Sequence, residues 1–130
     1  VVEATVAAVC ARGVDPGSLL AWLGPAIGAA AYEVGAQVTE ALGGDDTLAL
    51  MPGPSGRTHL DLDCLARGRL RGCGVERIYG GGACTHADST RFFSHRRDGM
   101  TGRQASLIWL ERAPGHADRL KGGKMAPLSR

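Results

Sequence analysis

Residues 78–110 constrain the fold more than any other part of the chain, because strand-like runs flank a polar loop there. At the start of this segment, residues 75–79 (VERIY) alternate between apolar and charged side chains, which is typical of a half-buried strand. Residues 105–110 (ASLIWL) form a short apolar run, which predicts a buried strand. Between them, three consecutive glycines from Gly80 let the backbone bend or approach another group closely. We therefore expect a strand, a glycine-rich loop, a second strand that carries arginine and phenylalanine, a turn and a final strand.

Hydrophobic residues recur at helical spacing in three stretches before this segment. The first expected helix covers residues 1–12 and ends before Gly13, because glycine readily takes the conformation that ends a helix. The second expected helix covers residues 32–42. The third covers residues 62–70 and begins at an N-cap, Asp61.

A further short strand is expected at residues 21–23, and a Gly-Pro bend would end it. Residues 47–57 contain two prolines and two glycines, and we expect a loop there. The resulting order of helices and strands predicts an α+β fold, in which helices pack on a mixed sheet. From Arg112 onward the sequence has no apolar periodicity. We therefore expect a domain or partial domain at residues 1–111 and a loose C-terminal tail at residues 112–130.

The composition excludes several classes of partner. A chain of 130 residues forms one domain or part of one. The formal net charge of +2 is too small to indicate binding to nucleic acid or to a membrane surface, and no apolar run is long enough to span a bilayer. The four cysteines have irregular spacing and no CxxC pair, so we expect reduced thiols in a cytoplasmic protein. They are Cys10, Cys64, Cys73 and Cys84.

Cys84 and His86 are two residues apart, so on a strand they would point to the same face. They could form half of a zinc or copper site, because thiolate and imidazole suit both metals. A Cys–His nucleophile–base pair is a weaker alternative, since no third orienting group is evident. The more common explanation is a buried thiol beside a polar loop histidine.

A group of arginines with two phenylalanines is the other candidate site. Guanidinium groups recognise phosphate or carboxylate through paired hydrogen bonds, and aromatic rings stack on nucleobases. The alternative is that the arginines cover a solvated strand face while the phenylalanines fill the core. The residues are Arg91, Phe92, Phe93, Arg96, Arg97 and Arg103.

Three separate blocks of this sequence resemble the C-terminal part of the YfiH family, which is variously described as a laccase domain, a polyphenol oxidase and a purine nucleoside phosphorylase. The first block contains CTHAD, RFFSHRRDG, TGR and ASLIWL, in that order. The second is AWLGPAIG followed by YEVG, and the third is LDLDCLARGRLRGCGVERI. The blocks follow the family order and together cover roughly residues 1–110.

The resemblance implies mixed β-sheets covered by helices, in a domain of which this chain holds an incomplete part. It also implies metal-dependent phosphorolysis of adenosine, inosine, guanosine and methylthioadenosine, with adenosine deaminase activity. Purine nucleoside and phosphate are the implied small-molecule partners. In the family pocket, Arg96, Arg97 and Arg103 would form one side, and Phe92 and Phe93 would shape it.

The complete family protein is expected to hold zinc or copper through two histidines and one cysteine, in motifs such as TADC and HAGWRG that this chain lacks. Cys84 matches the family's CT motif, which is not one of those ligands. Val1 would lie in the helix that follows HAGWRG. We therefore expect that this chain alone binds no metal tightly, and that it needs the missing N-terminal half or associates with itself.

Three functions follow from these observations. The first is that the chain is the C-terminal part of a purine nucleoside phosphorylase. The second is a non-catalytic fragment or binding remnant that lacks the metal site. The third, which we rank lower, is a copper polyphenol oxidase, because the sequence shows no histidine-rich copper pattern.

Overall fold

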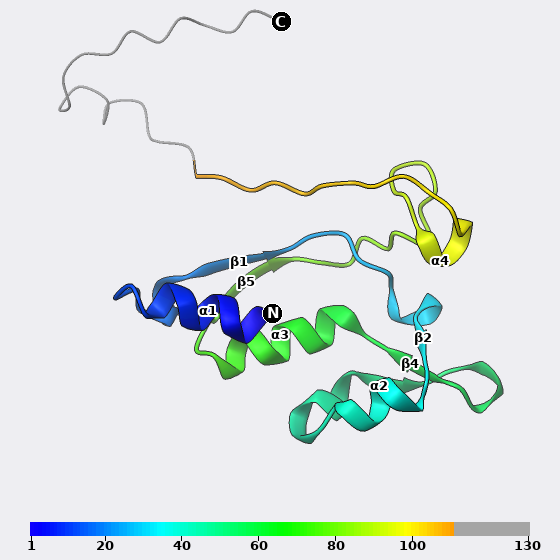
Figure 1. The fold of residues 1–130 in the computed structure, drawn as a ribbon, viewed down its shortest axis with the longest axis horizontal. Helices are drawn as coiled ribbons and strands as arrows, with labels where there is room; N and C mark the ends of the chain where they lie inside the picture. Colours follow the sequence, from blue (N-terminus) through cyan, green and yellow to red (C-terminus); the bar gives the residue numbers. More distant parts are fainter. Residues whose placement is uncertain (111–130) are drawn as a thin grey trace, which may run out of the picture.

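The chain folds around two small sheets (Figure 1), and the computed structural model describes residues 1–110. Strand β1 (Leu20–Leu23) pairs in parallel with β5 (Arg77–Gly80). The second sheet is antiparallel and has the strand order β2 (Glu33–Val34), β4 (Thr58–Leu60) and β3 (Leu50–Pro52). Parallel and antiparallel sheets with helices confirm the expected α+β class.

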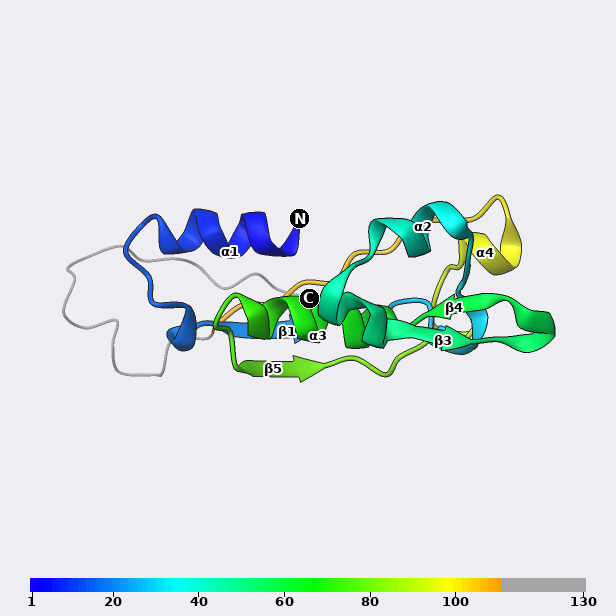
Figure 2. The same cartoon turned by 90° about the horizontal axis from the view of Figure 1, so that it is seen from below.

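Two of the predicted helices pack beside the parallel pair. Helix α1 (Val2–Cys10) and helix α3 (Leu62–Gly72) contact each other; α1 lies toward the end of the molecule away from the short helix α4 (His95–Asp98), and α3 runs through the middle (Figure 2). Asp61 caps α3 as expected, because its carboxylate accepts a hydrogen bond from the Cys64 N–H at 2.9 Å.

The hydrophobic core lies where α1, α3 and the start of β5 meet. Val6, Leu70 and Val75 form its buried cluster, and apolar side chains of β1 and β5 pack against them. Few other hydrophobic side chains among residues 1–110 are fully buried. The described part of the chain therefore has a small core for its length.

The three consecutive glycines form a loop that α3 holds in place. All three have positive φ, with 85° at Gly81, a backbone conformation that other residues rarely adopt. The Asp63 carboxylate accepts a hydrogen bond from the Gly82 N–H at 2.7 Å, and Arg67 donates to the carbonyl of Gly80 at 2.6 Å. A Cβ at Gly81 would lie only 2.5 Å from the Asp63 carboxylate. The predicted close approach of the backbone to another group is therefore observed here.

The predictions for the middle of the chain are partly wrong. Of the helix expected at residues 32–42, only α2 (Ala36–Ala41) is helical, because β2 before it pairs with β4 instead. The expected loop at residues 47–57 contains β3, which also pairs with β4. Pro52 ends β3, which is an edge strand of this sheet, and proline is tolerated at such edges.

Two strands predicted after the glycine loop are also absent. The arginine- and phenylalanine-rich stretch forms turns followed by α4, which Ser94 caps. Residues 105–110 are not part of any strand, because no described segment pairs with them. The tail predicted at residues 112–130 lies outside the described residues. Within residues 1–110, no helix has the length and apolar character needed to cross a membrane.

Candidate functional site

Arg97 organises the segment that precedes the candidate site. Its guanidinium donates to the carbonyl oxygens of Thr85 at 2.8 Å, His86 at 2.9 Å and Phe92 at 3.0 Å. It also makes two 2.7 Å hydrogen bonds to the Asp98 carboxylate. These bonds use every N–H group of the guanidinium. Arg97 therefore ties α4 to the two turns before it and has no donor left for a ligand.

The hydrogen bonds between Arg97 and Asp98 change the pKa of both side chains. The hydrogen bonds from Arg97 lower the pKa of Asp98, despite an opposing contribution from burial. In return, the same hydrogen bonds raise the pKa of Arg97 above its ordinary value. Both side chains therefore stay charged at neutral pH, and the ion pair holds α4 in place.

Asp88 stabilises the turn that precedes Arg97 and α4. Its carboxylate accepts hydrogen bonds from the Thr90 hydroxyl at 2.7 Å and from the Arg91 N–H at 3.1 Å, and it forms an ion pair with the Arg91 side chain. The Thr90 hydroxyl and then Arg91 lower the pKa of Asp88 to about 2. Arg91 also lies over the Phe92 ring at 5.0 Å, so both residues serve this turn.

A cavity of about 430 Å³ opens between α4, the chain that follows α4, and residues on either side of the 3-10 turn η2 (Ala29–Ala31), namely residues 25–27 and Tyr32. Three of the residues predicted from the sequence line it, namely Phe93, Arg96 and Arg103. Tyr32 and His95 also line it and were not among the site residues predicted from the sequence. The only sequence signal for Tyr32 was its position in the YEVG motif.

Arg96 is placed by contacts with the chain before α2. Its guanidinium lies over the Tyr32 ring at 5.4 Å and donates to the carbonyl of Glu33 at 3.2 Å. One hydrogen bond leaves other N–H groups of this arginine for a ligand. Arg103 has no hydrogen bond or ion pair with any of residues 1–110 and is exposed at the mouth of the cavity.

Phe93 presents an aromatic face to the same cavity. Phe93 as a whole is 53% exposed, and its ring lies against Gly102, where an added Cβ would be 2.8 Å from the ring. Its backbone N–H donates to the side-chain oxygen of Gln104 at 2.8 Å, which connects the main chain before α4 to the chain after it. Phe92 is half-buried and does not line the cavity.

Cys84 and His86 do not form the strand pair that their spacing suggested. Cys84 makes an isolated bridge with Ala26, and a turn follows it. The Cys84 sulfur accepts hydrogen bonds from the N–H groups of Gly28 at 3.1 Å and Ala87 at 3.3 Å. Burial raises the pKa of the thiol, but these N–H groups and Arg97 outweigh it, so the pKa lies below its ordinary value. His86 contributes its carbonyl to Arg97.

The cysteines form no disulfide among residues 1–110, and these residues provide few possible metal ligands close together. All four cysteines are free, as expected. Residues 1–110 contain no group of three or more histidine, cysteine, aspartate or glutamate side chains placed to hold a metal ion. A catalytic zinc site takes about three protein ligands, so the described residues do not fit one by themselves.

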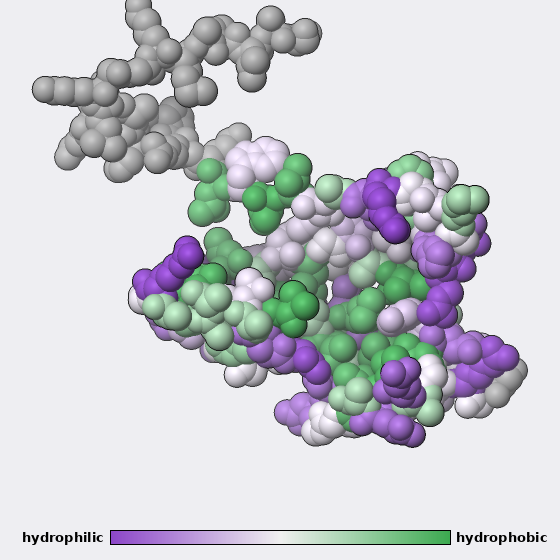
Figure 3. Space-filling view, in the orientation of Figure 1, coloured by the Kyte–Doolittle hydropathy of each residue, from purple (hydrophilic) through white to green (hydrophobic). Residues whose placement is uncertain are grey.

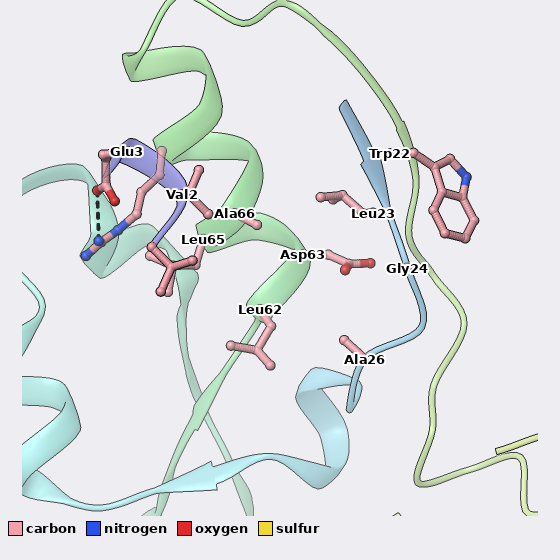
Figure 4. Close-up of a pocket in the computed structure, with 12 residues that line it drawn as sticks. Val2, Glu3, Trp22, Leu23, Gly24, Ala26, Leu62, Asp63, Leu65 and Ala66 are labelled. Carbon is pink, nitrogen blue, oxygen red and sulfur yellow. Dashed lines mark hydrogen bonds and ion pairs between the residues drawn. The ribbon is translucent and has the colours of Figure 1, made fainter. Parts of the chain in front are cut away.

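A larger cavity, of about 490 Å³, is mainly apolar. Figure 3 shows hydrophobic surface gathered in the hollow in the middle of the molecule. Leu62 and Leu65 line this cavity from α3, and Leu23 and Trp22 line it from β1, although Figure 4 shows the side chains of Leu23 and Trp22 pointing to opposite sides of the strand.

The polar side chains at this second cavity are already paired. Asp63 accepts a hydrogen bond from the Gly82 N–H. Arg69 makes ion pairs with Glu3 at 2.8 Å and Asp46 at 2.7 Å. Among the described residues, the charged side chains that line the apolar cavity are therefore all paired, and the arginine-lined cavity is the better candidate for chemistry.

The α+β fold with a basic, aromatic-lined cavity corresponds to a known class of proteins. A family model described as "Multi-copper polyphenol oxidoreductase laccase" matches residues 1–111. The chain belongs to this family, which includes the YfiH proteins.

Individual relatives agree with this assignment. The chain is 46% identical over 115 residues to a purine nucleoside phosphorylase of Pseudomonas aeruginosa, covering 85% of this chain and 46% of the relative. It is 50% identical over 98 residues to purine nucleoside phosphorylase YfiH of Escherichia coli, covering 74% and 40%. A crystal structure of Bacillus licheniformis YfiH superposes with a TM-score of 0.69 at 28% identity, over 75% of this chain and 39% of the other. The chain thus spans less than half the length of these relatives.

Proposed function

We propose that this chain supplies one side of the nucleoside and phosphate site of a purine nucleoside phosphorylase. The observation that supports this proposal is the cavity lined by Arg96, Arg103, Tyr32 and Phe93. It combines cationic groups that suit phosphate with aromatic faces that suit a purine. The names of the P. aeruginosa and E. coli relatives point to the same chemistry.

In phosphorolysis, a phosphate oxygen bonds to C1′ of the ribose while the bond from C1′ to the purine nitrogen breaks. The purine leaves with the bonding electrons and takes up a proton, and ribose 1-phosphate is the other product. In the proposed site, Arg103 and the free N–H groups of Arg96 bind the phosphate and stabilise its charge. Phe93 stacks on the purine. These roles need only the side chains that line the cavity.

The remaining candidate residues act indirectly in this proposal. Arg97 positions α4 and thereby Arg96, and Arg91 stabilises the turn before it. The carbonyl groups of Phe92 and His86 accept hydrogen bonds from Arg97, and Cys84 lies near enough for the Arg97 charge to lower the pKa of its thiol. We therefore keep Arg97 and Phe92 as positioning residues, in place of the direct contacts suggested by the resemblance.

We also propose that residues 1–111 are the C-terminal part of a family domain, whose remaining part supplies the metal ligands. Zinc or copper therefore enters no step assigned to the described residues. Adenosine, inosine, guanosine and methylthioadenosine are the proposed substrates, and adenosine deamination is a second proposed activity. Four free thiols suit a reducing compartment such as the cytoplasm.

The test uses a chimera that joins the part of E. coli YfiH outside the matched segment to this chain. Phosphorolysis of inosine is measured as phosphate-dependent release of hypoxanthine. Arg103→Ala should lower kcat/KM by about 10- to 150-fold, the loss expected for one charge-assisted hydrogen bond of ~1.5–3 kcal/mol. Arg71→Ala, which changes an exposed arginine of α3, is the matched control and should have no effect.

Three outcomes would contradict the proposal. Unchanged kinetics with a lowered melting temperature in Arg103→Ala would make this arginine structural. A well-folded chimera that binds metal but does not cleave inosine or adenosine would favour the non-catalytic alternative. Phosphate-independent oxidation of a phenol by the chimera would favour the polyphenol oxidase alternative.

A further inference from the structure

Residues 105–110 have an extended backbone without partners. None of their N–H or C=O groups forms a hydrogen bond with another of residues 1–110. Ser106, near the start of this segment, lies beside the residue that follows β1, where a Cβ at Gly24 would be 3.3 Å from the Ser106 hydroxyl. Extended backbone with unpaired polar groups is a template for another strand.

The side chains of the same segment are apolar on both faces. Leu107 and Trp109 alternate with Ile108 and Leu110, so each pair would occupy one face of a strand. Their exposed fractions are 80%, 73%, 70% and 85%, respectively. Strands that are apolar on both faces lie inside sheets that are covered on both sides. The segment therefore has the composition of a central strand but the surroundings of an exposed one.

Because residues 107–110 are apolar on both faces, their pattern also indicates what kind of partner can pair with the segment. Two copies of the segment paired with each other would form a two-stranded ribbon, with both apolar faces still open to water, and such ribbons are marginally stable. A larger partner must supply the pairing strand together with covering layers. In the P. aeruginosa and E. coli relatives, more than half of the sequence lies outside the segment that matches this chain.

We propose that residues 105–110 become a central strand by pairing with an apolar strand from the part of the family domain that lies outside this chain. The inference concerns the assembly of the domain and is independent of which reaction the arginine-lined cavity performs. The partner strand satisfies the unpaired backbone groups, and the layers around it bury Leu107, Ile108, Trp109 and Leu110. The exposed apolar surface of these four side chains is the face that would be covered.

The experiment mixes the full 130-residue chain with the part of E. coli YfiH outside the matched segment, expressed separately. Light scattering after gel filtration gives the stoichiometry, and amide hydrogen exchange reports on residues 105–110. We expect a one-to-one complex in which these amides exchange at least tenfold more slowly than in the chain alone.

Two variants test whether residues 105–110 form the contact with the YfiH part. Ile108→Pro removes one backbone N–H and should weaken the complex at least tenfold. Leu48→Asp is the control, because Leu48 is similarly exposed (77%) but lies in the 3-10 turn η3 (Gly44–Ala49). It should leave the affinity unchanged. Circular dichroism of each variant alone establishes that it has folded.

Three results would overturn the inference. The first is a complex without protection of residues 105–110, and the second is equal weakening by both variants. The third is a dimer of this chain that protects the segment and excludes the YfiH part, which would make a second copy the occupant. A complex that forms as expected but has no phosphorolysis activity would contradict only the proposed function.

Discussion

The region formed by α1, β1, α3 and β5 and the region from Cys84 to Leu110 are held together by different forces. In the first region, apolar side chains meet in a buried cluster and the strands pair with each other. In the second, charged side chains such as Arg97 bind backbone carbonyls directly, and little apolar surface is buried. Apolar packing thus stabilises the region formed by α1, β1, α3 and β5. Hydrogen bonds from individual side chains stabilise the region from Cys84 to Leu110. The difference explains why the second region has side chains available for a ligand or a partner.

The largest expected effect tests the packed region. Leu70→Ala should lower the free energy of unfolding by about 2–5 kcal/mol, because it leaves a cavity in the buried cluster. Leu107→Ala in the other region should change it by less than about 0.5 kcal/mol, since that side chain is exposed. Urea unfolding followed by circular dichroism measures both. Similar losses for the two variants would show that the regions are packed alike.

The next effect concerns the junction between the regions. Gly81→Ala should cost roughly 2–4 kcal/mol, because it adds a contact with Asp63 to the cost of a positive φ. Gly82→Ala is a matched control, since its φ of 77° is similar but an added Cβ has open space. It should cost only about 1–2 kcal/mol. Equal losses in thermal unfolding would mean that the approach of α3 to the loop is unimportant.

A smaller and more local effect is expected for Arg97→Lys. Lysine cannot donate to all the groups that the guanidinium holds, so the turns before α4 should open more often. Cleavage by chymotrypsin after Phe92 or Phe93 should become faster, on the order of tenfold, while the buried cluster remains intact. Arg103→Lys should leave cleavage unchanged. Global unfolding of Arg97→Lys would show instead that the two regions are not separable.

The smallest effect is the pH response of one turn. The pKa of Asp88 is lowered to about 2 from an ordinary 3.8, so its ionised form stabilises the fold above that ordinary value. This stabilisation is lost as the pH falls through about 2. The carboxyl carbon signal of Asp88 in NMR should therefore titrate near pH 2, and Asp88→Asn should speed exchange of the Thr90 amide at neutral pH. A midpoint near 3.8 would indicate that the hydrogen bonds of this turn are absent in solution.

Sequence patterns predicted the packed region because local signals and tertiary contacts agree there. The periodicity of α1 and α3, the Asp61 cap and the alternation before Gly80 all correspond to observed elements. The tiny strands β2 and β4 were missed, because pairing with each other stabilises them more than any property of their own residues.

The candidate cavity contains residue types that the sequence indicated, but their contacts could not be predicted. Sequence alone indicated arginines and phenylalanines in one segment, and three of them do line a cavity. It could not separate Arg97, which is used internally, from Arg103, because that distinction depends on carbonyl groups brought near by turns. Residues 105–110 were predicted as a buried strand from composition, but burial depends on a partner that the described residues do not provide.

The parallel pairing of β1 with β5 has a consequence for how the chain folds during synthesis. Leu20 pairs with Arg77, so a loop containing α2, α3 and the whole antiparallel sheet must close before this ladder can form. Contacts between distant residues form slowly, whereas the neighbouring strands β3 and β4 can pair early. We expect β1 to remain without its partner until the ribosome has released β5, and pulsed hydrogen exchange should show its amides protected last.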